Sequence, residues 1–200
     1  MAKYGMVVDL RKCVGCTACV VACKSEHNTP SGIFQTTVLD KEMGKFPKSI
    51  RVFVPVLCNH CDEPTCVDVC PTKASYKQDN GVVNIDYEKC IGCAACVEHC
   101  PYQVRTLVQD NRVLFPDGVS TFEKPVHRKI PNNVATKCDF CYHRLDAGKK
   151  PACSNVCPTE ARMFGDLEDP NSEASQQIKK WKAWTMLPEK GTRPRVFYIG

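Results

Sequence analysis

Apolar and polar residues alternate over short stretches of the chain, and this period of two predicts β-strands with one buried face. The clearest alternating runs are Met6/Val8/Leu10, Val52/Val54/Val56 and Val83/Ile85. Asp79-Asn80-Gly81 stands just before the last run and is typical of a tight turn between two strands. The pattern therefore predicts short strands, some of them joined in hairpins.

A longer helical period occurs near the end of the chain. Residues 172–187 predict a helix that presents Ile178, Trp181 and Leu187 on one side. We expect this helix to pack on its own domain, and a docking element for a partner is the alternative. No run approaches 18 apolar residues, so no membrane-spanning segment is predicted.

Two segments of the sequence repeat each other. "DLRKCVGCTACVVAC", from Asp9, and "DYEKCIGCAACVEHC", from Asp86, agree without a gap at the acid, the lysine, the glycine and all four cysteines. The chain holds sixteen cysteines in four such clumps. The other two clumps vary the spacing, with gaps of two, four and three residues from Cys58 and of two, eleven and three from Cys138. This is an internal duplication, repeated more loosely.

The end of each clump predicts a short helix. The third and fourth cysteines are four residues apart, which places them on one face of a helical turn. Pro71, Pro101 and Pro158 follow the last cysteine of three clumps and prevent the turn from continuing. The first clump has Lys24 at this position instead.

Sixteen cysteines can serve three kinds of chemistry. Disulfides require an oxidising compartment, and the first ten residues show no secretory signal. Zinc accepts paired Cys-x2-Cys knuckles and is the second alternative. The run Cys-x2-Cys-x2-Cys-x3-Cys, followed by Pro at Pro101, is typical of [4Fe–4S] ligation, in which the fourth cysteine binds a neighbouring cluster. We therefore predict iron–sulfur clusters, and Gly15 and Gly92 as positions where backbone lies close to a cluster.

The charge of the chain agrees with buried anions better than with nucleic acid. The formal net charge is +5, but a [4Fe–4S] cluster with four thiolates carries about two negative charges, so several clusters would outweigh it. No run of five basic residues and no basic-aromatic platform occurs. Lys12, Lys89 and Lys137 each precede a first cysteine, and we hypothesise that they raise cluster potentials locally.

The chain resembles the four-cluster iron–sulfur electron-transfer subunit of the molybdopterin oxidoreductases, such as the dimethyl sulfoxide, polysulfide, thiosulfate, tetrathionate and arsenate respiratory reductases. The resemblance covers about residues 3–175, including "CNHCDEPTCVDVCP" and "KCDFCYHRLDAGKKPACSNVCPTEARMFGDLEDPNSE". It implies four [4Fe–4S] clusters and a nested pairing of first with fourth and second with third motifs. The spacing alone also permits pairing of first with second and third with fourth.

The resemblance implies these ligands: Cys13, Cys16, Cys19 and Cys157 for cluster 1; Cys23, Cys138, Cys141 and Cys153 for cluster 2; Cys58, Cys61, Cys66 and Cys100 for cluster 3; Cys70, Cys90, Cys93 and Cys96 for cluster 4.

Other polar residues are expected to play supporting parts. His60 and His99 lie inside complete cysteine motifs, so we interpret them as packing or N–H···S groups rather than ligands. His27, His127 and His143 are expected to be structural or exposed. The adjacent Asp62-Glu63 is interpreted as polar loop, and no nucleophile elbow, phosphate loop or dinucleotide fingerprint occurs.

The predicted fold is α+β: two intertwined bacterial ferredoxin-like modules with loop insertions and a C-terminal helical extension. The predicted boundaries are 1–57 with 137–175 for the first module, including an insertion at 24–57; 58–101 for the second module; 102–136 for a second insertion; and 176–200 for the extension.

The predicted function is electron relay without an active site. The resemblance implies a large molybdenum or tungsten pterin subunit as partner for the first module, and a quinol-reactive membrane subunit or cytochrome for the second. The same relay in a hydrogenase, formate dehydrogenase or carbon monoxide dehydrogenase is the near alternative, and a zinc protein without redox function the distant one. Either the cytoplasm or export with a signal-bearing catalytic subunit fits this sequence.

Overall fold

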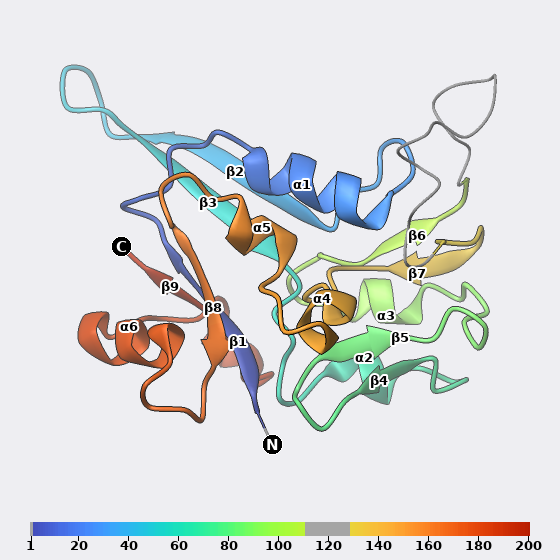
Figure 1. Cartoon of the computed structure of the whole chain (residues 1–200). Helices are drawn as coiled ribbons and strands as arrows, with labels where there is room; N and C mark the ends of the chain where they lie inside the picture. Colours follow the sequence, from blue (N-terminus) through green and yellow to red (C-terminus); the bar gives the residue numbers. More distant parts are fainter. Residues whose placement is uncertain (1, 111–128) are drawn as a thin grey trace.

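The computed structural model describes residues 2–110 and 129–200, and its largest sheet has three strands (Figure 1). These are β1 (Tyr4–Asp9), β8 (Arg162–Asp166) and β9 (Val196–Ile199), in the order β8-β1-β9. β1 pairs antiparallel with β8 and parallel with β9. The central strand places Met6 and Val8 in one apolar cluster and Val7 in another, so both faces of the sheet are covered.

Three two-stranded hairpins complete the sheets. They are β2 (Thr36–Met43) with β3 (Ile50–Leu57), β4 (Ser75–Lys77) with β5 (Val83–Ile85), and β6 (Thr106–Val108) with β7 (Val134–Thr136), all antiparallel. The three alternating runs of the sequence thus lie in β1, β3 and β5, except that Leu10 is one residue beyond the end of β1. Asp79-Asn80-Gly81 lies in the turn before β5. The β2–β3 hairpin projects from the rest of the molecule (Figure 1).

Five helices follow or lie within the cysteine motifs. They are α1 (Ala18–His27), α2 (Thr65–Asp68), α3 (Ala95–Glu98), α4 (Tyr142–Asp146) and α5 (Ala152–Asn155). The predicted effect of proline is confirmed, because α2, α3 and α5 all end before the fourth cysteine of their motif. α1, whose motif has Lys24 instead, continues four residues beyond Cys23.

The C-terminal helix is shorter than predicted. α6 (Glu173–Trp181) is capped by Ser172, whose side chain accepts a hydrogen bond from the Ser175 amide, and it ends where Lys182 adopts a left-handed conformation. The predicted extension to Leu187 is wrong, because Leu187 lies beyond this cap, before a 3₁₀ turn (Pro188–Lys190). Ile178 packs against Val7, as expected of a helix that covers its own domain.

The elements form two halves, which we define by their motifs. In the first half, α1 packs on α5 and on β2, and α5 packs on β8 of the β8-β1-β9 sheet. In the second half, α2 packs on α3, next to the β4–β5 and β6–β7 hairpins (Figure 1). A common apolar cluster, which includes Val8, Leu57, Val82 and Phe140, joins the halves. The fold is therefore mixed α and β with small sheets, as predicted.

Candidate metal centres

The first group of thiols combines three cysteines of the first motif with one cysteine of the fourth motif. Cys13 and Cys16 lie in the loop before α1, Cys19 lies in its first turn, and Cys157 follows α5. Burial raises the pKa of Cys19, and the nearby thiols of Cys153, Cys13 and Cys157 raise it further. Thiols separated by more than 130 residues of sequence are therefore close enough to interact, while Cys16 is exposed.

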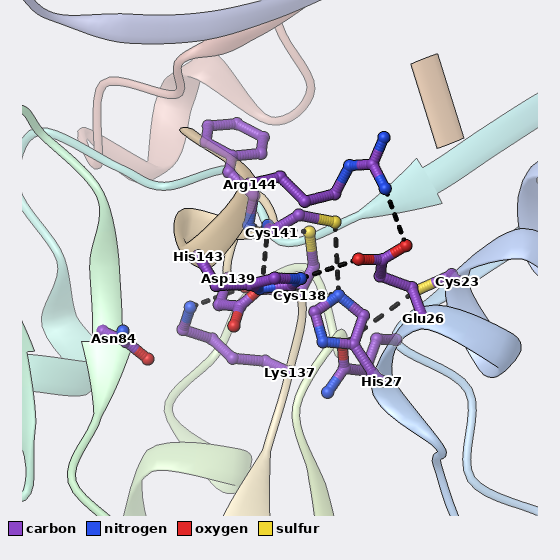
Figure 2. Close-up of polar contacts among 12 residues, drawn as sticks. Cys23, Glu26, His27, Asn84, Lys137, Cys138, Asp139, Cys141, His143 and Arg144 are labelled. Carbon is purple, nitrogen blue, oxygen red and sulfur yellow. Dashed lines mark hydrogen bonds and ion pairs between the residues drawn. The ribbon is translucent and has the colours of Figure 1, made fainter. Parts of the chain in front are cut away.

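The second group is the most deeply buried. Cys23, Cys138, Cys141 and Cys153 are all buried, and burial raises the pKa of Cys23, Cys138 and Cys141. In each case, charges on other members of the same group add to the effect. Figure 2 shows Cys23, on α1, facing Cys138 and Cys141.

The third group lines one cavity in the second half. Cys58, Cys61, Cys66 and Cys100 all border it, together with Arg105. Burial and the neighbouring Cys58 thiol raise the pKa of Cys61 to about 12. The pKa of Cys66 is raised to about 11, mainly by burial.

The fourth group contains Cys70, Cys90, Cys93 and Cys96. Cys96 is buried beside Ile85, and Cys90 packs against the same cluster. Cys93 is exposed, and the Cys70 thiol accepts a hydrogen bond from the Ser75 amide at 3.4 Å. Although burial opposes it, this bond helps to lower the pKa of Cys70, which favours a thiolate.

The donor set fits iron–sulfur chemistry. All sixteen cysteines have free thiols, and in three groups they converge on one another. Thiols packed together in this way resist ionisation unless a metal cluster compensates the charge. Two buried arginines, Arg105 and Arg162, also lie among them, which agrees with an anionic occupant.

The loops of the duplicated motifs have nearly the same backbone. Gly15 and Thr17 have φ of 69° and 58°, and Gly92 and Ala94 have φ of 70° and 60°. Glycine is thus favoured at both positions because φ is positive and because other groups lie close to the backbone there. A Cβ at Gly15 would meet the Phe53 ring, and one at Gly92 the Asn133 carbonyl oxygen.

One histidine that we expected to be structural or exposed lies beside a thiol. His27 is buried, and its Nε2 lies 3.3 Å from the Cys141 thiol and 3.5 Å from the Asp139 carboxylate (Figure 2). One possible ligand atom from each of His27, Asp139 and Cys141 lies within 4.8 Å of the others, and all three residues are buried. The signal in the sequence was its position four residues after Cys23, on the same helix face.

The other histidines differ in their environment. His60 is fully buried, its Nδ1 accepts a hydrogen bond from the Val83 amide, and its ring stacks on Phe140 with centroids 3.7 Å apart. Burial lowers the pKa of His60 well below its usual value, so the ring is neutral. His99 contacts the Ala95 carbonyl, and His143 contacts Glu26 at 2.7 Å. His127 lies outside the described residues.

The charged residues of the motifs also separate into two kinds. Lys12 and Lys89 are exposed, whereas Lys137 is buried and donates to the carbonyls of Val83 and Cys138. Asp62 pairs with Lys77 and Arg195, and Glu63 pairs with Arg193. These two acids are thus held in ion pairs at the loop of the second motif.

Comparison with known proteins places the chain in a family. A model described as a 4Fe-4S dicluster domain matches residues 50–114 and 123–167, and a second model of the same description matches residues 12–75. The chain belongs to the 4Fe–4S dicluster iron–sulfur subunits. The predictions of iron–sulfur binding and of two ferredoxin-like modules are thereby confirmed.

Similar proteins are subunits of oxidoreductase complexes. The arsenate respiratory reductase iron–sulfur subunit of Shewanella sp. (strain ANA-3) is 42% identical, over 98% of this chain and 96% of its own length. A putative dimethyl sulfoxide reductase iron–sulfur subunit of Halobacterium salinarum is 39% identical, over 100% and 79% of the two chains. A sulfite dehydrogenase subunit of Allochromatium vinosum is 39% identical, over 100% and 83%.

These comparisons confirm the function at the level of the subunit. The dicluster iron–sulfur subunit relays electrons within an oxidoreductase complex, and the reaction itself is carried out elsewhere. Within residues 2–110 and 129–200, no helix is long and apolar enough to cross a membrane.

Proposed function

We propose that this chain holds four [4Fe–4S] clusters and passes single electrons along them between a molybdenum or tungsten pterin subunit and a second redox partner. The observation that carries this is the convergence of thiols from motifs far apart in the sequence, Cys23 with Cys138, Cys141 and Cys153 above all. This convergence supports the nested pairing, because pairing of the first motif with the second would bring Cys23 to Cys58 instead.

The remaining groups support the same scheme. Cys157 interacts with Cys19 of the first motif, and Cys100 of the third motif lines the cavity that Cys58 and Cys66 of the second also line. Three of the four proposed ligand sets are thus supported by contacts or by a shared cavity. The fourth, Cys70 with Cys90, Cys93 and Cys96, rests on the duplication of the motif and on family resemblance.

The order of the clusters follows from the halves. Clusters 1 and 2 belong to the first half and clusters 3 and 4 to the second, with His60, Phe140 and Lys137 packed between clusters 2 and 3. The two outer clusters have the exposed loops: Val14 and Cys16 at one, Ile91 and Cys93 at the other. We assign electron entry and exit to these loops.

The partners follow from the relatives. Arsenate and dimethyl sulfoxide reductases and a sulfite dehydrogenase use similar subunits, so the relay serves reduction and oxidation alike. By family resemblance, we assign the pterin subunit to the loop of cluster 1 and a membrane subunit or cytochrome to that of cluster 4. The proposed module boundaries remain 1–57 with 137–175, and 58–101.

A metal inventory of the natively purified complex tests this proposal. We expect about sixteen iron atoms from this chain, with stoichiometric molybdenum or tungsten. The same amount of iron without molybdenum or tungsten would support the four-cluster relay but overturn the pterin partner. The partner would then be a hydrogenase, a formate dehydrogenase or a carbon monoxide dehydrogenase. Zinc in place of iron would overturn the proposal.

A further inference from the structure

Two buried arginines occupy equivalent positions in the duplicated chain. Arg105 and Arg162 each follow the last cysteine of a motif by five residues, in "CPYQVR" and "CPTEAR". Each residue is only 3% exposed. Neither forms a salt bridge with a carboxylate within the part of the chain that the structure describes. Because a buried cation without a counter-ion is strongly destabilising, each arginine requires an anion nearby.

Arg105 lies among cysteines that we propose as ligands of both clusters of the second half, and these become thiolates when a cluster binds. Its Nη2 donates to the Cys66 thiol at 3.0 Å, and its Nη1 donates to the Ser75 hydroxyl at 2.8 Å. Although burial lowers it, negative charge on Cys66, Cys58 and Cys96 raises the pKa of Arg105 overall. Cys58 and Cys66 belong to the third thiol group, and Cys96 to the fourth.

Arg162 has the same relation to the first half. The amide of its neighbour Ala161 donates to the Cys157 thiol at 3.3 Å, and the hydroxyl of Ser154, next to Cys153, donates to the Arg162 carbonyl at 2.8 Å. Negative charge on Cys153, Cys19 and Cys138 raises the pKa of Arg162 against the effect of burial. Cys19 belongs to the first thiol group and the other two to the second. One Nη of Arg162 donates to the Thr36 hydroxyl at 3.0 Å, while Nε and the other Nη have no hydrogen-bond partner among the described residues.

We propose that Arg105 and Arg162 are cationic bridges, each placed between the two clusters of one half, and that each raises the reduction potential of both neighbours. This inference rests on the proposed four-cluster relay. A cation fixed beside a cluster stabilises the reduced state, which carries one more negative charge, more than the oxidised state. Hydrogen bonds to cluster sulfur act in the same direction.

The guanidinium group suits this role better than an ammonium group. It is planar, remains charged under all conditions, and presents five donors that can point to two groups at once. The free Nε and Nη1 of Arg162 provide donors for the sulfur atoms of a bound cluster. Both arginines thus act on the reduction potentials of the clusters through charge and hydrogen bonds.

The test is a redox titration of the anaerobically purified complex, followed by electron paramagnetic resonance, for Arg105→Gln and Arg162→Gln. At a fixed ambient potential, we expect the ratio of reduced to oxidised cluster to fall about tenfold at two clusters in each variant, equivalent to about 59 mV for a one-electron couple. Arg162→Gln affects the pair of the first half and Arg105→Gln the pair of the second, so each variant is the control for the other.

Two further variants separate tuning from folding. Lysine at either position keeps a charge but cannot reach both clusters, so Arg105→Lys and Arg162→Lys should lower the potentials less than glutamine and unequally within the pair. Lys45→Gln removes an exposed positive charge between β2 and β3, at the end of the hairpin that projects from the rest of the molecule, and it should move no potential.

The outcomes are distinct from those of the metal inventory. Unchanged potentials in either glutamine variant with full iron content would overturn the inference. If a glutamine variant fails to assemble, a lysine variant at that position that lowers neither potential of its pair, or lowers both equally, would overturn it instead. An equal shift at all four clusters would overturn it as well. Wild-type protein without about sixteen iron atoms would instead overturn the proposed function.

Discussion

The two duplicated motifs share a ligand loop but differ in the helix after it. Gly15 and Gly92 have φ of 69° and 70°, so the loops that carry the first three cysteines are nearly superimposable in backbone. Yet α1 has ten residues and α3 has four. The residue after the fourth cysteine is Lys24 in one and Pro101 in the other, and only the proline prevents helical continuation. Duplication therefore preserved the ligand loop, while one residue changed the length of the helix.

The longer helix gives the first half additional contacts. Glu26, in the last turn of α1, accepts hydrogen bonds from His143 and Arg144 of α4 at 2.7 and 2.9 Å. His27, beside it, reaches Cys141. In the second half, α3 ends at Glu98, and a turn rather than the helix leads to Cys100, the fourth cysteine of the third motif. The first half thus ties its fourth motif to its first through side chains as well as through proposed clusters.

The largest expected effect comes from replacing the fourth cysteine of one motif in each half, Cys23 of the first motif or Cys100 of the third. Under nested pairing, Cys23→Ser removes the cluster of Cys138, Cys141 and Cys153, or converts it to a three-iron cluster, and leaves cluster 1 in place. Cys100→Ser does the same to cluster 3. Iron analysis and electron paramagnetic resonance should show a loss of up to about four of sixteen iron atoms in either variant.

A second variant in each pair makes this result decisive. Cys23→Ser and Cys153→Ser should remove the same resonance signal, because both ligate cluster 2 in the proposed scheme. If Cys23→Ser instead removes the signal that Cys66→Ser removes, the motifs pair first with second and the nested scheme is wrong.

The sequence predicted those parts of the molecule that depend on local chemistry. Alternation located β1, β3 and β5, and the position of proline decided where α2, α3 and α5 end. Turn residues located the bend before β5. These features depend on a few neighbouring residues, and so they can be derived from one sequence.

Features that depend on distant partners were missed. β9 pairs with β1, although about 190 residues separate Val7 from Phe197. α6 ends at Trp181, where Lys182 takes a left-handed conformation that propensity alone does not indicate. His27 lies beside Cys141, and Arg162 interacts with Cys19 as well as with the nearer Cys153; Cys141 and Cys19 are each more than 100 residues away from these partners. Spacing identified the ligands as a set, but the surroundings of each thiol are fixed by tertiary contacts.

A smaller effect is expected from making the two duplicated motifs alike. Lys24→Pro places in the first motif the residue that the other three have. In the interior of α1, proline removes a backbone hydrogen bond and clashes with the preceding turn, so we expect a loss of about 3 kcal/mol in the free energy of unfolding. It should also release the contacts of Glu26 with α4 and of His27 with Cys141. Denaturant unfolding of the complete protein measures the change.

Lys24→Ala is the matched control. The Lys24 ammonium donates to the carbonyls of Thr29, Pro30 and Ile33 and to the Thr29 hydroxyl at 3.0 to 3.2 Å, and it lies over the Phe34 ring. Alanine removes these side-chain contacts, as proline does, but keeps the helix. If Lys24→Pro is no more destabilising than Lys24→Ala, the length of α1 does not depend on the absence of proline, and the explanation of the difference between the halves fails.

The smallest effect should distinguish the two glycines that the loops share. Alanine at either position is strained by about 1–2 kcal/mol, because φ is positive. At Gly15 the added Cβ meets the Phe53 side chain, which can move, whereas at Gly92 it meets the carbonyl oxygen of Asn133, which is backbone. We therefore expect Gly92→Ala to be more destabilising than Gly15→Ala by about 1–2 kcal/mol in denaturant unfolding.

The double variant Gly15→Ala/Phe53→Ala shows whether the neighbours cause this difference. Removing the ring should relieve the clash at position 15, so the two substitutions together should destabilise less than the sum of their separate effects. No side-chain substitution can remove the Asn133 carbonyl from Gly92, and its alanine variant should keep its full cost. Additive effects of Gly15→Ala and Phe53→Ala would mean that backbone strain alone requires glycine in both loops. The halves would then differ in their helices but not in the tolerance of their ligand loops.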